Sequence, residues 1–364
     1  MKSPSLFSRL GRTRLLAAGL VGSAAMLAHG QPVLPEYQPA QGVSGLIRSW
    51  GSPHMGGLLK NWQEGFRKFH PGIVFADNLK GTASATYGFA TNQAELGLMG
   101  RQIYTFEYYP VYRRSHLLPV EIEVATGSLD VPHKSFALAV MVHRDNPLAQ
   151  LTLRQLDGIF GAQREGGWQG MNWVKKAARP AADDIRTWGQ LGLTGEWADK
   201  PIHVYGPPGL HPGGISYFQR RVMGGSDRWA ENLMEFEDRA AMMAALSRDP
   251  LGIAYTGLCY LTTATKALAL AEQDGGPFVA PTRSSVADRT YPLSRPVYIY
   301  FAPDTPAGDP AVDPKVREFL RYILSRQGQD DVAREGDYLP LSPAVLRAQL
   351  DRLEAPAVRI PPSH

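Results

Sequence analysis

The clearest structural signal in this chain is the segment LIRSWGSPHMGGLLKNWQEGFRKF, residues 46–69. Residues 46–50 have the composition of a short strand, and a Gly-Ser-Pro loop at 51–53 follows them. From Met55 to Phe69, apolar side chains recur every three or four residues, as on one face of an amphipathic helix. The order of strand, short polar loop and helix predicts an α/β layer.

The same alternation continues along the rest of the chain. Strands are predicted at 73–76, 95–100, 136–143, 202–205, 252–255 and 295–302. Helices are predicted at 152–160, from 215 onward, at 240–246 and from 316 to about 328. This order favours mainly parallel sheets covered by helices.

Residues 1–30 are predicted to be a signal peptide. Four basic residues precede the apolar run 15–27, which is short for a membrane span, and small residues at 28 and 30 suit cleavage before Gln31. The alternative is a retained N-terminal anchor. We expect a mature chain that begins near Gln31, is periplasmic or secreted, and has no stable membrane span.

Removal of this segment changes the charge of the chain. Four of the 38 basic side chains lie in it, so the remaining 34 equal the 34 acidic ones. A neutral mature chain gives no reason to expect a nucleic-acid partner. Its length of about 330 residues predicts two lobes. Cys259 has no second cysteine to pair with, and its apolar neighbours suggest a small buried side chain.

Several segments carry a resemblance when they are taken in order and with their spacing. They are 51–62, 94–99, 138–148, 153–160, 188–193, 252–255 and 291–296. Over roughly residues 46–341, this set resembles the phosphate-type periplasmic solute-binding proteins of ABC importers. Each segment alone is a weak signal, whereas the ordered set is fairly specific.

The resemblance implies a two-lobed periplasmic-binding-protein fold of type II. Each lobe would be a mainly parallel sheet flanked by helices, and two crossover segments would join them. One lobe would contain residues 43–131 and 258–353, the other residues 132–257, and residues 354–364 would be a disordered tail.

The resemblance also implies a function. The chain would capture a small anion, phosphate or a related oxyanion, in a cleft between the lobes, with an ABC permease as its partner. It would act as a monomer without a cofactor. The alternative is a diverged binding-protein fold that acts as a secreted or periplasmic interaction or sensing protein without transport.

An enzyme is the third hypothesis. The chain has no G-x-S-x-G, H-E-x-x-H or P-loop sequence. His54 and His211 could meet across a cleft and bind a metal, but no third ligand has convincing spacing. We therefore predict neither catalysis nor a metal site.

Helix N-termini and hydroxyl-rich loops suit an anion, because both offer hydrogen-bond donors. By the resemblance, three loops and one strand end would form the site. The candidate residues are Ser52, His54, Met55, Thr82, Ala83, Ser84, Arg101, His211, Gly213, Gly214 and Ile215. The simpler alternatives are an N-cap role for Ser84, a surface charge for Arg101 and an exposed turn for His211.

The candidate site departs from the family pattern. Pro53 and His54 stand where an acidic residue and a hydroxyl are usual, and Gly100 replaces another small hydroxyl. In the third loop, 212–214 reads Pro-Gly-Gly instead of Ser-Gly-Thr, and Pro207 stands where an arginine or other polar residue is usual. Each lost hydrogen bond to a charged ligand is worth about 1.5–3 kcal/mol, so phosphate affinity is in question.

Overall fold

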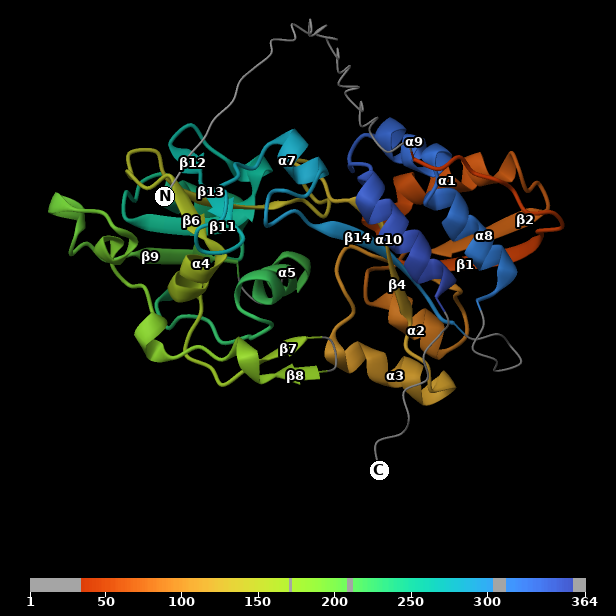
Figure 1. Cartoon of the computed structure of the whole chain (residues 1–364), viewed down its shortest axis with the longest axis horizontal. Helices are drawn as coiled ribbons and strands as arrows, with labels where there is room; N and C mark the ends of the chain where they lie inside the picture. The colour runs from red at the N-terminus through yellow and green to blue at the C-terminus, as the bar shows by residue number, and fades with distance from the viewer. Residues whose placement is uncertain (1–33, 170–171, 208–211, 304–311, 356–364) are drawn as a thin grey trace, which may run out of the picture. The chain divides into compact units, whose positions relative to one another are not determined.

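The computed structural model describes residues 34–169, 172–207, 212–303 and 312–355, and within them most strands belong to two five-stranded sheets (Figure 1). The predicted signal peptide, His211 and residues 356–364 of the predicted tail lie outside this part. No helix in the described ranges is long and apolar enough to cross a membrane.

The first sheet has the order β2-β1-β3-β14-β4. Its strands are β2 (Ile73–Asn78), β1 (Gly45–Gly51), β3 (Leu96–Met99), β14 (Pro296–Phe301) and β4 (Val120–Thr126). β14 is antiparallel to both of its neighbours, so the other four strands run in one direction.

The second sheet repeats this plan with the order β10-β9-β11-β5-β12. Its strands are β10 (Leu233–Glu235), β9 (His203–Gly206), β11 (Gly252–Gly257), β5 (Leu138–His143) and β12 (Thr265–Ala267). Again only the fourth strand in the order, β5, is reversed. The prediction of mainly parallel sheets is therefore confirmed. Two short pairs complete the strands: β6 (Gln150–Thr152) with β13 (Ala269–Ala271), and β7 (Gly167–Gln169) with β8 (Asn172–Val174).

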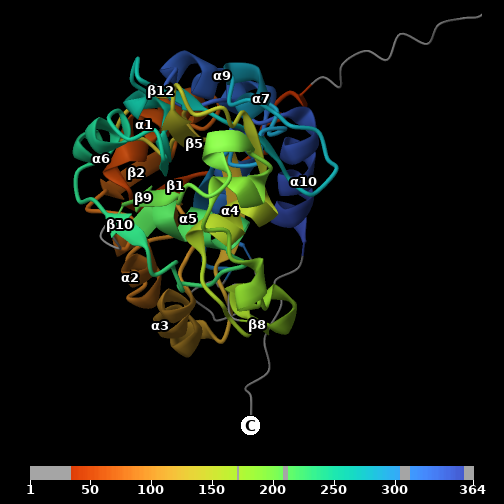
Figure 2. The same ribbon diagram turned by 90° about the vertical axis from the view of Figure 1, so that its left-hand side faces the viewer.

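Helices from both ends of the chain accompany the first sheet. They are α1 (Gly56–Arg67), α2 (Ser84–Ala90), α3 (Thr105–Ser115), α8 (Pro314–Ile323), α9 (Arg326–Glu335) and α10 (Pro343–Glu354). In Figure 1 the blue C-terminal helices lie beside α1, while Figures 1 and 2 both show α2 next to α3. The second sheet carries α4 (Leu153–Phe160), α5 (Pro212–Val222), α6 (Arg239–Leu246) and α7 (Arg283–Ala287).

The core of the first lobe confirms the apolar periodicity that predicted α1. Leu58, Leu59, Trp62 and Phe66 are buried there with residues of α8 and α9. The predicted helix from 316 to about 328 is in fact two helices. The Ser325 hydroxyl accepts a hydrogen bond from the Gly328 N–H and begins α9, which then continues to Glu335.

The first crossover, residues 127–138, leads from β4 into β5, and the second, residues 288–295, leads from α7 into β14. The two crossover segments lie side by side. The Gly127 N–H donates to the Arg295 carbonyl at 2.5 Å, and the Leu138 N–H donates to the Leu293 carbonyl at 3.1 Å. The second lobe also extends further than the sequence suggested, because β12 pairs with β5 and residues up to Leu293 share its core. The predicted boundary after residue 257 therefore moves to about residue 294. Strands of three residues are too short to produce a periodic signal.

Gly51 provides a test of how β1 and β3 approach each other. Its φ is +137°, and a Cβ at this position would lie 2.2 Å from the Leu98 carbonyl oxygen. We expect Gly51→Ala to lower the free energy of unfolding by more than the roughly 1–2 kcal/mol that a left-handed alanine costs, because the clash adds to the strain. Urea unfolding of the variant and the wild type measures this difference in the free energy of unfolding.

Gly192→Ala is the matched control. Gly192 also has a positive φ, +87°, but nothing lies within 4 Å of the added Cβ. Equal losses of stability in the two variants would contradict a role for the close approach of Gly51 to β3.

Candidate functional site

A cleft of about 640 Å³ lies between the two lobes and brings together most of the residues that the sequence singled out. Those that line it are Ser52, His54, Thr82, Ala83, Arg101, Gly213 and Gly214. They come from the loop after β1, the loop before α2, the segment after β3 and the first turn of α5. Residues distant in the sequence thus face one cavity.

The loop after β1 holds Ser52 at the carboxyl end of the sheet. Its N–H donates to the Leu98 carbonyl at 2.8 Å, and its side chain is only 2% exposed. His54 lines the cleft, partly desolvated by it but still open to solvent, whereas Met55 is fully buried in the core of the first lobe. Met55 therefore does not line the cleft, and the hydrophobic effect accounts for its position.

The loop before α2 offers one free hydroxyl. The Ser84 Oγ donates to the Gly81 carbonyl at 2.7 Å, so it serves its own turn and does not line the cleft. Thr82 lies in the cleft and makes no side-chain hydrogen bond to any residue of the described ranges. Its hydroxyl is therefore available to a ligand.

Arg101 lies in the wall of the cleft, but its guanidinium is already occupied. Nη1 and Nη2 each donate to a carboxylate oxygen of Glu107 at 2.7 Å, and the guanidinium carbon lies 3.9 Å from the centre of the Tyr104 ring. The same carboxylate accepts from the Tyr104 N–H at 2.8 Å. Arg101 therefore stabilises the start of α3, a role that the sequence did not predict.

The third loop is described only from its helical part onward. α5 begins at Pro212, three residues before the predicted start, and Gly213 and Gly214 in its first turn line the cleft. Their N–H groups have no partners within the helix. Ile215 is buried and does not line the cleft.

The structure adds cleft residues that the sequence did not indicate. They are His133, Lys134, Ser135 and Phe136 of the first crossover, Arg295 of the second, and Glu237, Asp238, Arg239 and Tyr260 of the second lobe. Arg295 stands in the 291–296 segment that carried part of the resemblance. The only sequence signal for its role is an arginine at the start of the strand predicted at 295–302.

The Ser135 hydroxyl lies beside Gly100, the position at which the family pattern has a small hydroxyl residue. A Cβ at Gly100 would lie 2.3 Å from the Ser135 Oγ, which donates to the Gly100 carbonyl at 3.2 Å. The crossover hydroxyl thus occupies the space that a side chain at position 100 would need. Any side chain at position 100 would therefore displace the Ser135 hydroxyl from this place.

Lys134 ties the first crossover to the first lobe. Its ammonium group lies 3.1 Å from a Glu335 carboxylate oxygen and 2.8 Å from one of Asp337, and it donates to the His54 carbonyl at 3.1 Å. Burial, with the nearby charges of Lys134 and His133, lowers the pKa of His54. His54 is therefore neutral at pH 7.

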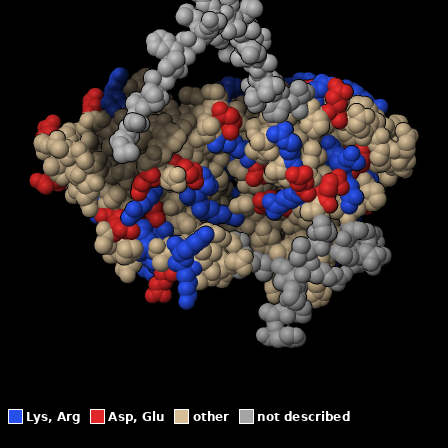
Figure 3. Space-filling model, viewed as in Figure 1, with Lys and Arg blue, Asp and Glu red and all other residues tan. Residues whose placement is uncertain are grey.

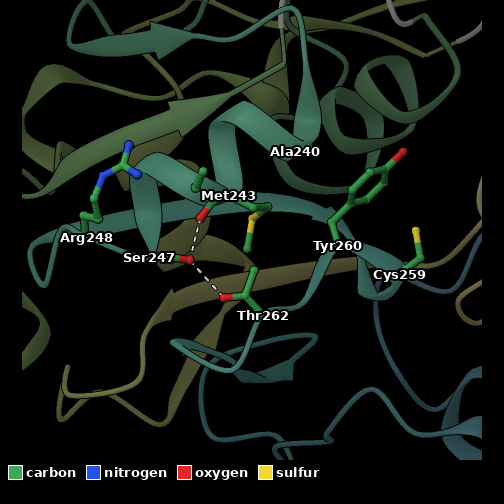
Figure 4. Close-up of a pocket in the computed structure, with 8 residues that line it drawn as sticks. Ala240, Met243, Ser247, Arg248, Cys259, Tyr260 and Thr262 are labelled. Carbon is green, nitrogen blue, oxygen red and sulfur yellow. Dashed lines mark hydrogen bonds between the residues drawn. The ribbon is translucent and has the colours of Figure 1, made fainter.

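A second pocket, of about 470 Å³, lies beside the cleft on α6 (Figure 4). Two of its hydroxyls are already engaged, since the Ser247 hydroxyl donates to the Met243 carbonyl and bonds to the Thr262 hydroxyl. Burial raises the pKa of the Cys259 thiol at its edge to about 11, which keeps the thiol protonated. The pocket's one charged lining residue, Arg248, is exposed, and no residue of the second crossover lines this pocket.

The described residues contain no group of three or more His, Cys, Asp or Glu side chains that could hold a metal ion. On the face shown in Figure 3, basic and acidic side chains are interspersed. The arrangement that remains is a cleft between two α/β lobes, with hydroxyls, backbone N–H groups and cations in its wall. This arrangement defines a periplasmic-type solute-binding protein.

Comparisons with known proteins agree with this class. A family model described as a PBP superfamily domain matches residues 38–327. The phosphate-binding protein PstS of Pseudomonas aeruginosa is 34% identical over 340 residues, which are 93% of this chain and 96% of the relative. The chain belongs to the PBP superfamily and, within it, to the phosphate-type solute-binding proteins. Members of this family are binding proteins and not enzymes, in agreement with the prediction of no catalysis.

Two solved structures share the fold. PstS from Borrelia burgdorferi has a TM-score of 0.53 and 15% sequence identity, covering 82% of this chain and 99% of that one. An ABC-type phosphate transport receptor from Vibrio cholerae has a TM-score of 0.50 and 19% identity, covering 80% and 99%. They confirm the two-lobed architecture that the resemblance implied.

The protonation of His54 reports on the cleft. In the ligand-free protein we expect its pKa below the ordinary 6.5, because partial burial and nearby positive charge disfavour the imidazolium. The unfolded chain then takes up the proton first, so the free energy of unfolding falls as the pH drops below 6.5. NMR titration of the ring measures the pKa directly.

Adding phosphate should raise the pKa of His54, because a nearby anion stabilises the imidazolium. His116, at the end of α3 and not among the cleft residues, is the control whose ring signals should not respond. A His54 titration curve that saturating phosphate leaves unchanged would argue against an anion in this cleft.

Proposed function

We propose that this chain is an exported solute-binding protein that captures phosphate in the cleft and delivers it to an ABC permease. The relative from P. aeruginosa is by name a phosphate-binding protein, and the similarity covers nearly the whole of both chains. This similarity supports the same class of ligand here, despite the substitutions in the loops.

The observation that carries the proposal is a set of hydrogen-bond donors without internal acceptors. Within the described ranges, the Ser52 and Thr82 side chains make no hydrogen bonds, and both residues line the cleft. Gly213 and Gly214 line the cleft from the other lobe, and their N–H groups, in the first turn of α5, have no acceptor within the helix. Donors that converge from both lobes suit an anion, and the helix dipole adds a favourable field.

Charge in the cleft acts locally. The mature chain is formally neutral if it begins near Gln31, so it has little long-range attraction for an anion. Of the carboxylates that line the cleft, both Glu237 and Asp238 are exposed, and Asp238 accepts a hydrogen bond from the Ala241 N–H at the start of α6. These acidic groups belong to the second lobe, whereas the hydroxyl-bearing loops belong to the first.

A periplasmic location follows from the same proposal. The predicted signal peptide supports export, and the family supplies binding proteins to importers that take up solutes from the periplasm. A monomer that docks on a permease is the form we expect. The interaction with a permease is proposed from family membership alone.

Titration calorimetry of the mature chain, from Gln31 onward, tests the proposed function. The protein is unfolded and refolded first to remove any carried ligand. We expect one phosphate per chain with a Kd of about 1 μM or tighter, since several charge-assisted hydrogen bonds act together. If phosphate gives neither heat nor a thermal shift, the alternative of an interaction or sensing protein without transport gains support.

The Thr82 hydroxyl should contribute directly to that affinity. We expect Thr82→Val to weaken phosphate binding about 10-fold, because one hydrogen bond to a charged ligand is lost. Thr91→Val is the matched control, since its hydroxyl bonds to the Tyr87 carbonyl at the end of α2 and Thr91 does not line the cleft. Equal affinities of the two variants would contradict a ligand contact by Thr82.

A further inference from the structure

The second crossover places a buried cation without an anionic partner in the cleft. Arg295 directly precedes β14, its side chain lines the cleft, and the residue is 5% exposed. Its Nη2 donates to the Gly100 carbonyl at 2.7 Å. In the part of the chain that the structure describes, Nε and Nη1 make no hydrogen bond and no carboxylate forms an ion pair with this guanidinium.

Two neighbouring cations of the cleft differ from Arg295 in this respect. Arg101 is held by Glu107, and Lys134 is held by Glu335 and Asp337. These pairs serve the packing of the first lobe and leave little charge for a ligand.

Arg239 adds positive charge from the second lobe. Its guanidinium lies 5.8 Å from the centre of the Phe136 ring and 6.0 Å from that of Tyr260, and it forms no ion pair within the described ranges. Arg239 is only partly buried, so water solvates its charge better than that of Arg295.

A buried guanidinium without a counter-ion is unfavourable, because the protein interior does not replace the lost hydration. Burial accordingly lowers the pKa of Arg295. The nearest compensation that the fold offers is the Gly100 carbonyl and the face of the Tyr217 ring, 5.9 Å from the guanidinium carbon. Neither group carries a negative charge, so the positive charge of Arg295 stays uncompensated until an anion binds.

The first turn of α5 lies directly against this cation. A Cβ at Gly213 would be 3.0 Å from Nη2, and one at Gly214 would be 3.9 Å from Nη1. Glycine at position 213 lets the start of an eleven-residue helix approach the guanidinium closely, whereas the distance at position 214 is an ordinary van der Waals contact. The N–H groups of this turn, which have no acceptor within the helix, and Arg295 therefore border the same space.

We propose that Arg295 is the principal anion-binding residue of the cleft, and that its free nitrogens bind two oxygens of a tetrahedral oxyanion such as phosphate. The N–H groups of Gly213 and Gly214 hold the same anion. Arg295 thus supplies, from the crossover, the cation that Pro207 cannot supply from the third loop. This inference rests on the proposed function and names the residue that makes it work despite the missing hydroxyls.

Three variants test the inference by calorimetry with phosphate and by thermal unfolding without it. Arg295→Met keeps an unbranched apolar stem but removes the guanidinium, and we expect at least a 100-fold loss of affinity. Its melting temperature without phosphate should stay at or above that of the wild type, because an uncompensated buried charge is removed. Arg295→Lys keeps the charge but loses the two-pronged geometry, and about a 10-fold loss is expected.

Arg179→Met is the matched control. Arg179 is equally buried, at 5% exposure, but it lies outside the cleft and forms an ion pair with Asp184 at 2.7 Å. This variant should melt at a lower temperature, because Asp184 keeps only its ion pair with Arg186 and Asp157 loses one of its cations, while its phosphate affinity stays that of the wild type.

The outcomes separate this inference from the proposed function. If the wild-type protein binds no phosphate, the proposed function fails. If the wild type binds phosphate and Arg295→Met binds it within about 3-fold, only the role of Arg295 is overturned. If Arg295→Met does not fold, Arg295→Lys decides, since an affinity equal to that of the wild type overturns the inference and a 10-fold loss supports it.

Discussion

The backbone pairing of the two crossover segments is the constraint on which the cleft depends. Gly127 and Leu138 of the first crossover donate to Arg295 and Leu293 of the second, so both connections between the lobes are held together. Each crossover leads into the reversed strand of its sheet, β5 or β14. The carboxyl ends of the remaining strands then face the cleft, where ligands of open α/β sheets bind.

This pairing also explains why the chain tolerates an altered set of loops. The residues on the crossovers are fixed by the backbone ladder, so Ser135 and Arg295 can reach Gly100 from opposite connections. Hydrogen-bond donors that usually come from the loops can therefore come from the two crossover segments. The loops lose hydroxyls at positions 100, 212 and 214 while the cleft keeps a hydroxyl, a guanidinium and a helix start in the same region.

Much of this fold could be predicted from the sequence, because its signals are local. The apolar spacing from Met55 to Phe69 predicted α1, and the ordered segments predicted the two-lobed architecture. The boundary of the second lobe could not be predicted, since β12 and β13 have three residues each and are defined by their partners. The separate start of α9 depends on a single capping serine, Ser325.

The site was less predictable for a physical reason. Ser52 and Thr82 stand in recognisable loops, but the state of a charged side chain depends on residues that meet it only in the folded chain. The sequence suggested Arg101 as a ligand, but its guanidinium forms an ion pair with Glu107. Arg295 was predicted only as the first residue of a strand, but it lines the cleft. Burial and pairing, rather than residue type, separate the structural arginine from the one available to an anion.

A crystal structure of the mature chain grown with phosphate would show which residues hold the anion. We expect tetrahedral density between the lobes, in contact with Arg295, the N–H groups of Gly213 and Gly214, and the Thr82 hydroxyl. Phosphate bound elsewhere, or a cleft closed by the protein's own side chains with Arg295 paired to a carboxylate, would contradict this expectation.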